Sequence, residues 1–244
     1  MAAELGHRLP GLCAGLQMTG AGPAQPMTAS ELAEAIRIAY DPSVAGLIDQ
    51  ARAENGTRML RWDDVGPIAA QEAWDHYRHD GVFSVTWSMS EAPRGAVFSN
   101  VLARMVAPHA ELLRKRVTLL YRPHDPGTAA RLVERDRKDA MFKAKQSKVP
   151  NARDSVAVRA AEQAASEEAT GAGLIRFAML VTATVQNAAD LPLASSAIDN
   201  LSASSRILMR RVYGSQASAF AAALPLGLVL PMHLKVPQAV REAM

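Results

Sequence analysis

The chain has 244 residues, of which 49% are hydrophobic and 21% are charged, and its formal net charge is +3. That composition supports a buried core, and so small a charge excess predicts no nucleic-acid partner unless the basic residues gather in one patch. The single cysteine, Cys13, excludes an internal disulfide and fits a reducing compartment, and no apolar run is long enough to cross a membrane.

Residues 1–67 are expected to form a helical and irregular N-terminal segment. The first twenty residues predict a glycine-interrupted helix, without the apolar core of a signal peptide. Thr28 and Glu31 have capping-box spacing, which predicts a helix with Leu32, Ile36 and Ala39 on one face. That helix should end before Asp41-Pro42, because a residue that precedes proline avoids helical geometry. We expect residues 43–66 to form a surface connection with one short helix.

Residues 68–244 are expected to form one α+β domain. A helical turn through Trp74 is predicted for residues 68–79. Residues 83–89 alternate apolar and hydroxyl side chains, the pattern of a strand with one buried face. A helix ending near residue 106 and a strand over 116–122 would complete a first βαβ unit.

Charged residues and alanine dominate residues 127–170, which predicts a helical hairpin with its tip at 143–153. A β-type run over 174–184, an amphipathic helix and a short strand before Tyr213 predict a second βαβ unit. Two such units predict a ferredoxin-like sheet with the hairpin inserted between them. Alternation along the two long strands predicts one shared buried face, formed by Phe83, Val85, Trp87, Phe177, Met179 and Val181.

Motifs for catalysis are absent from the sequence. A P-loop needs Gly-Lys to gather phosphates, and this chain has no Gly-Lys pair. The nearest approach to a metal site or an orphan enzyme site is Asp75-His76 with His79-Asp80. These residues lack a third well-spaced ligand, so a solvated polar turn is the favoured interpretation. No catalytic residue, metal ligand or cofactor is therefore predicted.

Two polar features remain open to a functional reading. Ser215 follows Gly214 at a strand-to-helix turn, where an N-cap is favoured over an anion site. A basic cluster in the hairpin is interleaved with acidic residues, which favours a solvated helical face. Its alternative is a docking surface for an acidic partner, a membrane or DNA. The docking candidates within that cluster are Arg137, Lys138, Lys143, Lys145, Lys148 and Arg153.

Five motifs give the chain a family resemblance: residues 37–42 (RIAYDP), 62–67 (WDDVGP), 74–78 (WDHYR), 89–95 (MSEAPRG) and 213–225 (YGSQASAFAAALP). The chain resembles the N-terminal, non-catalytic domain of type IV secretion and conjugation ATPases. It is more similar to an actinobacterial membrane-associated family that carries this domain without the motor.

The resemblance implies a non-enzymatic scaffold at the cytoplasmic face of the cell membrane. Such a scaffold would position a separate hexameric P-loop ATPase, and self-association stays open. In the family two hydrophobic helices precede this region, so the chain is expected to be the soluble portion of a longer protein. A nucleic-acid-binding accessory that uses the basic hairpin and an orphan enzyme near residues 75–80 are the alternatives.

Overall fold

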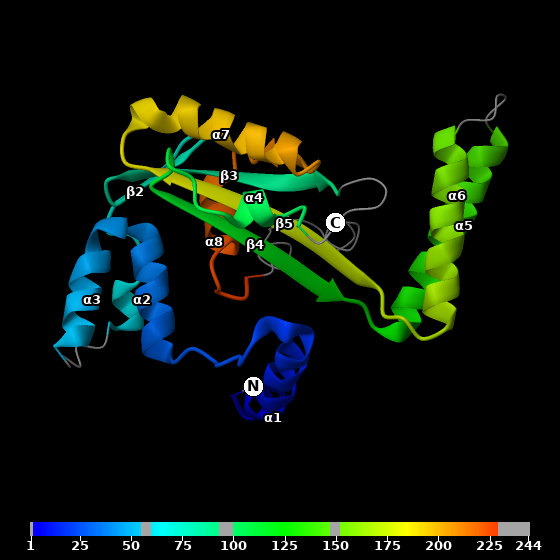
Figure 1. Ribbon diagram of the computed structural model, residues 1–244, viewed down its shortest axis with the longest axis horizontal. Helices are drawn as coiled ribbons and strands as arrows, with labels where there is room; N and C mark the ends of the chain where they lie inside the picture. Colours follow the sequence, from blue (N-terminus) through cyan, green and yellow to red (C-terminus); the bar gives the residue numbers. More distant parts are fainter. Residues whose placement is uncertain (1, 55–59, 93–99, 147–151, 229–244) are drawn as a thin grey trace. The chain divides into compact units, whose positions relative to one another are not determined.

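A computed structural model describes residues 2–54, 60–92, 100–146 and 152–228 (Figure 1). The fold is α+β, with an antiparallel sheet of six strands. The strands are β1 Ala70–Glu72, β2 Tyr77–His79, β3 Val82–Glu91, β4 Arg114–Pro123, β5 Ile175–Val185 and β6 Leu208–Arg211. The helices are α1 Ala2–Leu16, α2 Ala29–Tyr40, α3 Ala45–Ala53, α4 Ala103–Val106, α5 Pro126–Gln146, α6 Ala152–Ala169, α7 Leu191–Ser204 and α8 Gln216–Ala222.

Strand β3 is the centre of the sheet. The order is β1-β2-β3-β5-β4, and β6 also pairs with β3. β2 pairs with the first residues of β3 and β6 with its last, so both follow one edge of β3 while β5 occupies the other. Two hydroxyl pairs, Ser84 with Thr184 and Thr86 with Thr182, mark the antiparallel alignment of β3 and β5.

The chain divides into two compact units, and each is described by itself. The first contains Met1–Val117 and Val181–Met244. In this unit α7 covers one face of the sheet and α8 lies on the other (Figure 1). A cluster on the α8 side joins Ala33, Ile36, Ala39, Val65, Tyr77, Phe220 and Leu224. Residues on both sides of the predicted division at residue 67 thus share one core.

The predicted capping box of α2 is confirmed. The Thr28 hydroxyl accepts from the Glu31 backbone N–H, and the Glu31 carboxylate accepts from the Thr28 backbone N–H. These two bonds satisfy donors that the helix itself cannot satisfy. The cap fixes the start of α2, whose residues Ile36 and Ala39 enter the core as predicted.

Thr118–Leu180 form the second unit, which contains the helical hairpin α5–α6. The predicted hairpin is present. Asp125 accepts a hydrogen bond from the Thr128 backbone N–H, which caps the first turn of α5. Ala129 and Val133 are the buried residues of α5, whereas Ala130, which adjoins Ala129, is exposed.

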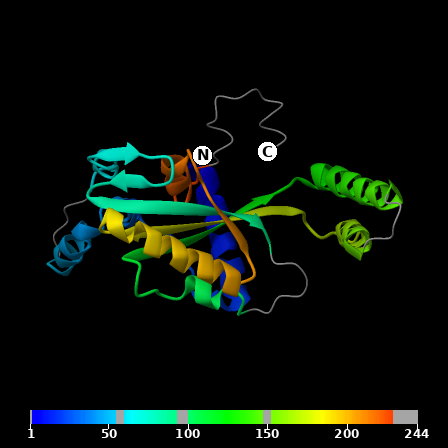
Figure 2. The same cartoon turned by 90° about the horizontal axis from the view of Figure 1, so that it is seen from above.

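A β-hairpin replaces the helical turn predicted for residues 68–79. β1 and β2 pair with each other beside β3, as Figure 2 shows. Asp80 and Gly81 both have positive φ, 42° and 89°, and connect β2 to β3 in a two-residue turn. That conformation is the one that Asp-Gly favours in tight hairpins. An Asp-Gly pair in the sequence indicates such a turn, so the helical prediction is wrong here.

The predicted buried face is confirmed at Val85 and Trp87 of β3, whereas Phe83 is only partly buried and the prediction is wrong for Phe177. Trp87 is 2% exposed, but Phe177 is 50% exposed, because β5 is buried only from Met179 onward. The opposite face of β3 also differs from expectation, since Ser84 and Thr86 are fully buried. Helices cover both faces of the sheet here, and hydroxyl pairs satisfy the buried polar groups.

Candidate functional site

The four polar residues at 75–80 do not form one site. His76 Nδ1 lies 2.8 Å from Asp75 Oδ1, and Asp75 also lies 3.7 Å from Arg211 Nη1. His79 and Asp80 make separate contacts in the interior. Within the described ranges, no group of three or more His, Cys, Asp or Glu side chains could hold a metal ion.

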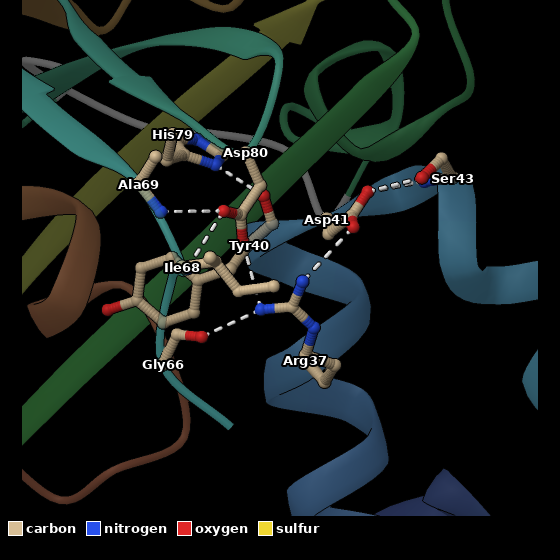
Figure 3. A network of polar contacts seen from close by, with 9 residues as sticks. All are labelled: Arg37, Tyr40, Asp41, Ser43, Gly66, Ile68, Ala69, His79 and Asp80. Atoms are coloured by element: carbon tan, nitrogen blue, oxygen red, sulfur yellow. Dashed lines mark hydrogen bonds and ion pairs between the residues drawn. The ribbon is translucent and has the colours of Figure 1, made fainter. Parts of the chain in front are cut away.

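Asp80 belongs to a buried ion-pair network centred on Arg37 (Figure 3). The Arg37 guanidinium donates to Asp80 Oδ2 at 2.9 Å, to Asp41 Oδ2 at 3.0 Å and to the Gly66 carbonyl at 2.7 Å. The second oxygen of Asp80 accepts from the backbone N–H groups of Ile68 and Ala69. With its charges and donors satisfied in this way, the network ties α2 to the β1–β2 hairpin and serves a structural role.

His79 is also structural. Its Nδ1 bonds the Tyr40 carbonyl, which can only accept, so Nδ1 carries the proton and Nε2 is an acceptor. Ser84 therefore donates to Nε2 at 2.8 Å and in turn accepts from Thr184 at 2.7 Å. Burial lowers the pKa of His79, which keeps the ring neutral. This serine–histidine pair resembles a nucleophile and its base, but both side chains are fully buried.

The segments WDHYR and YGSQ contact each other in the first unit. The rings of Trp74 and Tyr213 stack with centroids 6.1 Å apart, and the Gly214 N–H donates to the Trp74 carbonyl at 2.7 Å. Gly214 has φ +70°, and a Cβ there would lie 2.6 Å from Trp74 Cζ3. Glycine is required at this position because both the backbone conformation and the Trp74 ring exclude a side chain.

Ser215 occupies the N-cap position of α8 as predicted, but its side chain makes no cap bond. The cap comes from another element. Glu72 of β1 accepts from the Ala217 N–H at 3.0 Å. Because Glu72 lies far away in the sequence, local spacing could not identify it as the capping residue.

The basic residues predicted for docking have unequal surroundings. Arg137 binds Glu134 through two nitrogens at 2.9 Å, and Lys138 lies 3.6 Å from the same carboxylate. Local pairing of this charge is therefore confirmed. Lys143 and Lys145 are exposed in the last turn of α5, where cations complement the helix dipole. Arg153 lies in the first turn of α6, and Lys148 lies outside the described residues.

Large apolar side chains are exposed on the strands of the second unit. Strand alternation places Leu119 and Tyr121 on one face of β4, and Ile175 and Phe177 on one face of β5. Tyr121 is 65% exposed, and each of the other three is at least 42% exposed. The sequence did not predict this exposure, because the alternation of these residues is the same as that of a buried strand, and Phe177 was expected to be buried.

Comparison with known protein families gives no match, and no curated protein matches the chain. In the part of the chain that the structure describes, no helix has the length and apolarity needed to cross a membrane.

Proposed function

We propose that this chain is a non-enzymatic interaction scaffold, whose docking surface includes the exposed apolar strand faces of the second unit. The observation that carries the proposal is the exposure of Leu119, Tyr121, Ile175 and Phe177. Exposed apolar clusters of this kind mark protein contact sites, because leaving them in water costs free energy that a partner recovers. Aromatic residues are also the most frequent anchors of such interfaces.

The partner is proposed from the family resemblance. That resemblance favours a separate hexameric P-loop ATPase of a type IV secretion-like or conjugative apparatus, at the cytoplasmic face of the membrane. The exposed cations Lys143 and Lys145 of α5 would add electrostatic steering toward an acidic surface on that partner.

A pull-down with a P-loop ATPase that lacks its own N-terminal domain tests this proposal. Tyr121→Ser combined with Phe177→Ser should abolish capture of the ATPase. Trp62→Ser is the matched control, since Trp62 is an exposed aromatic residue of the first unit. Full capture by the double variant, or equal loss in the control, would contradict the proposed surface.

We also propose that β3, α4, β4, β5, α7 and β6 form a ferredoxin-like core. The order β6-β3-β5-β4 supports it, because the first and third strands of that arrangement lie between the fourth and the second. The α5–α6 hairpin would then be an insertion between the second and third strands. An experimental structure in which β4 pairs directly with β3 would contradict this assignment.

A nucleic-acid-binding accessory is the second candidate, and its basis is the basic residues of α5 and α6. Pairing of Arg137 with Glu134 leaves fewer free charges for phosphates than the sequence suggested. DNA titration at several salt concentrations separates the two functions. A steep loss of affinity with salt, abolished by Lys143→Gln with Lys145→Gln, would favour the nucleic-acid function.

A further inference from the structure

A basic pocket lies beside the start of β4 in the first unit. Its volume is about 360 Å³. The lining comprises Val106, Pro108, His109, Leu112, Leu113, Arg114, Lys115, Arg116 and Thr184. Three consecutive cationic residues line this pocket, and the lining contains no carboxylate.

Arg116 is the most unusual of these cations. Its Nη1 atom is buried and has no hydrogen-bond partner, and its guanidinium carbon lies 5.4 Å from the centroid of the Phe220 ring. Burial, together with the neighbouring charge of Arg114, lowers the pKa of Arg116 to about 10. A buried cation is costly unless an opposite charge accompanies it.

The surroundings of the three cations show that the pocket lacks a negative charge. Among the described residues, no ion pair joins Arg114, Lys115 or Arg116 to a carboxylate. Lys115 Nζ donates to the Ala107 carbonyl, which holds its cationic head against the loop before β4. The Thr184 hydroxyl donates its hydrogen bond to Ser84, so the positive character of the pocket comes from the basic side chains.

We propose that this pocket binds a phosphate group, carried either by a free phosphate compound or by the headgroup of an anionic phospholipid. A phosphate offers several anionic oxygens, which suits a planar guanidinium beside further cations. Bound phosphate would supply the counter-charge that Arg116 lacks. The site is separate from the strand surface proposed for protein docking and does not depend on it.

Inorganic phosphate and pyrophosphate are the free probes, with the whole chain in thermal-shift and calorimetric titrations. Ionic strength is held constant with chloride. A ligand that binds only the folded state raises Tm, and above its Kd the rise continues with the logarithm of the ligand concentration. Arg116→Gln and Arg114→Gln should each weaken binding by about tenfold or more, the effect of losing a charge-assisted contact. Arg210→Gln, at an exposed arginine of β6 that does not line the pocket, should bind like the wild type.

Vesicles distinguish the two sources of phosphate. The chain is sedimented with phosphatidylcholine vesicles that contain or lack phosphatidic acid. Binding to free phosphate without vesicle binding identifies a soluble ligand, and vesicle binding that Arg116→Gln removes identifies a lipid headgroup. Arg114→Gln keeps the test valid if Arg116→Gln fails to fold. The proposal is overturned if neither probe binds better than chloride, or if both pocket variants bind as the wild type does.

Discussion

Arg37 shows how a single side chain can determine the geometry of several segments. It lies between Asp41 and Asp80 and also holds the Gly66 carbonyl, while its own side chain is 7% exposed. Removal of the cation would leave two carboxylates close together with little water to solvate them. The motif that begins at Arg37 therefore has a structural explanation that requires no catalytic chemistry.

Arg37→Met should lower the free energy of unfolding by about 3–5 kcal/mol, the scale for breaking a buried ion pair from one side. Arg52→Met is the matched control, because Arg52 pairs with Glu34 while its side chain is 52% exposed. Urea denaturation followed by tryptophan fluorescence measures both. A loss at Arg37 no larger than the loss at Arg52 would contradict the importance of the buried network.

His79 gives stability a pH dependence whose sign follows from its lowered pKa. In the unfolded chain the pKa of the ring is about 6.5. Below that pH the unfolded state binds a proton that the folded state resists, so stability is complete above about pH 7 and declines as pH falls. Each pH unit should cost up to about 1.4 kcal/mol until the folded ring also protonates.

Urea midpoints between pH 5 and pH 8 test this expectation. His79→Gln should flatten the acid side of the profile, and His7→Gln, at an exposed position of α1, should leave it unchanged. An acid slope that persists in His79→Gln would assign the dependence to other groups.

Some features of the elements could be predicted from local sequence, and others could not. The capping box of α2 and the hairpin of α5 and α6 follow from spacing and composition over a few residues. Burial of Ser84 and Thr86 could not be predicted, because a hydroxyl that faces water and one that pairs across strands give the same alternation. The Glu72 cap of α8 depends on tertiary contact, which local patterns do not encode.

Substitution of Trp87 and of Phe177 by alanine tests which residues of β3 and β5 are buried. Trp87→Ala should cost about 3–5 kcal/mol, because it empties a large buried aromatic site. Phe177→Ala should cost about 1 kcal/mol or less, since half of that ring remains in water in the folded state. Chemical denaturation followed by circular dichroism measures both, and equal losses would contradict the observed exposure.

At the scale of the whole molecule, the sequence predicted the α+β class and the helical hairpin, but not the candidate sites. The polar residues at 75–80 make separate structural contacts, because Asp75 and His76 precede β2, whereas His79 is its last residue and Asp80 follows it. The basic pocket depends on how the loop before β4 folds, so its consecutive Arg114, Lys115 and Arg116 gave no local sign of a cavity. Exposure of Tyr121 and Phe177 likewise depends on where the covered part of the sheet ends.

The α5–α6 hairpin should be removable without unfolding the first unit. The His124 N–H donates to the Leu174 carbonyl at 3.0 Å, so the two strands are already joined next to the hairpin. Replacement of residues 125–173 by Asn-Gly would close β4 and β5 with a favoured two-residue turn. Shortening the connection should cost little chain entropy, because closure entropy changes slowly with loop length.

We expect this shortened chain to unfold cooperatively, with a free energy of unfolding within about 1 kcal/mol of the full chain, since Trp87 and its neighbours lie in the first unit. Tryptophan fluorescence in urea reports on this core, because Trp87 is the buried one of the three tryptophans. In a second variant only residues 146–152 are replaced by Gly-Ser. This variant measures the contribution of the hairpin tip to docking apart from that of the two helices. If both variants fold and still capture the ATPase, docking would lie on the strands alone. Loss of cooperative unfolding in the Asn-Gly variant would show instead that the hairpin is required for the fold.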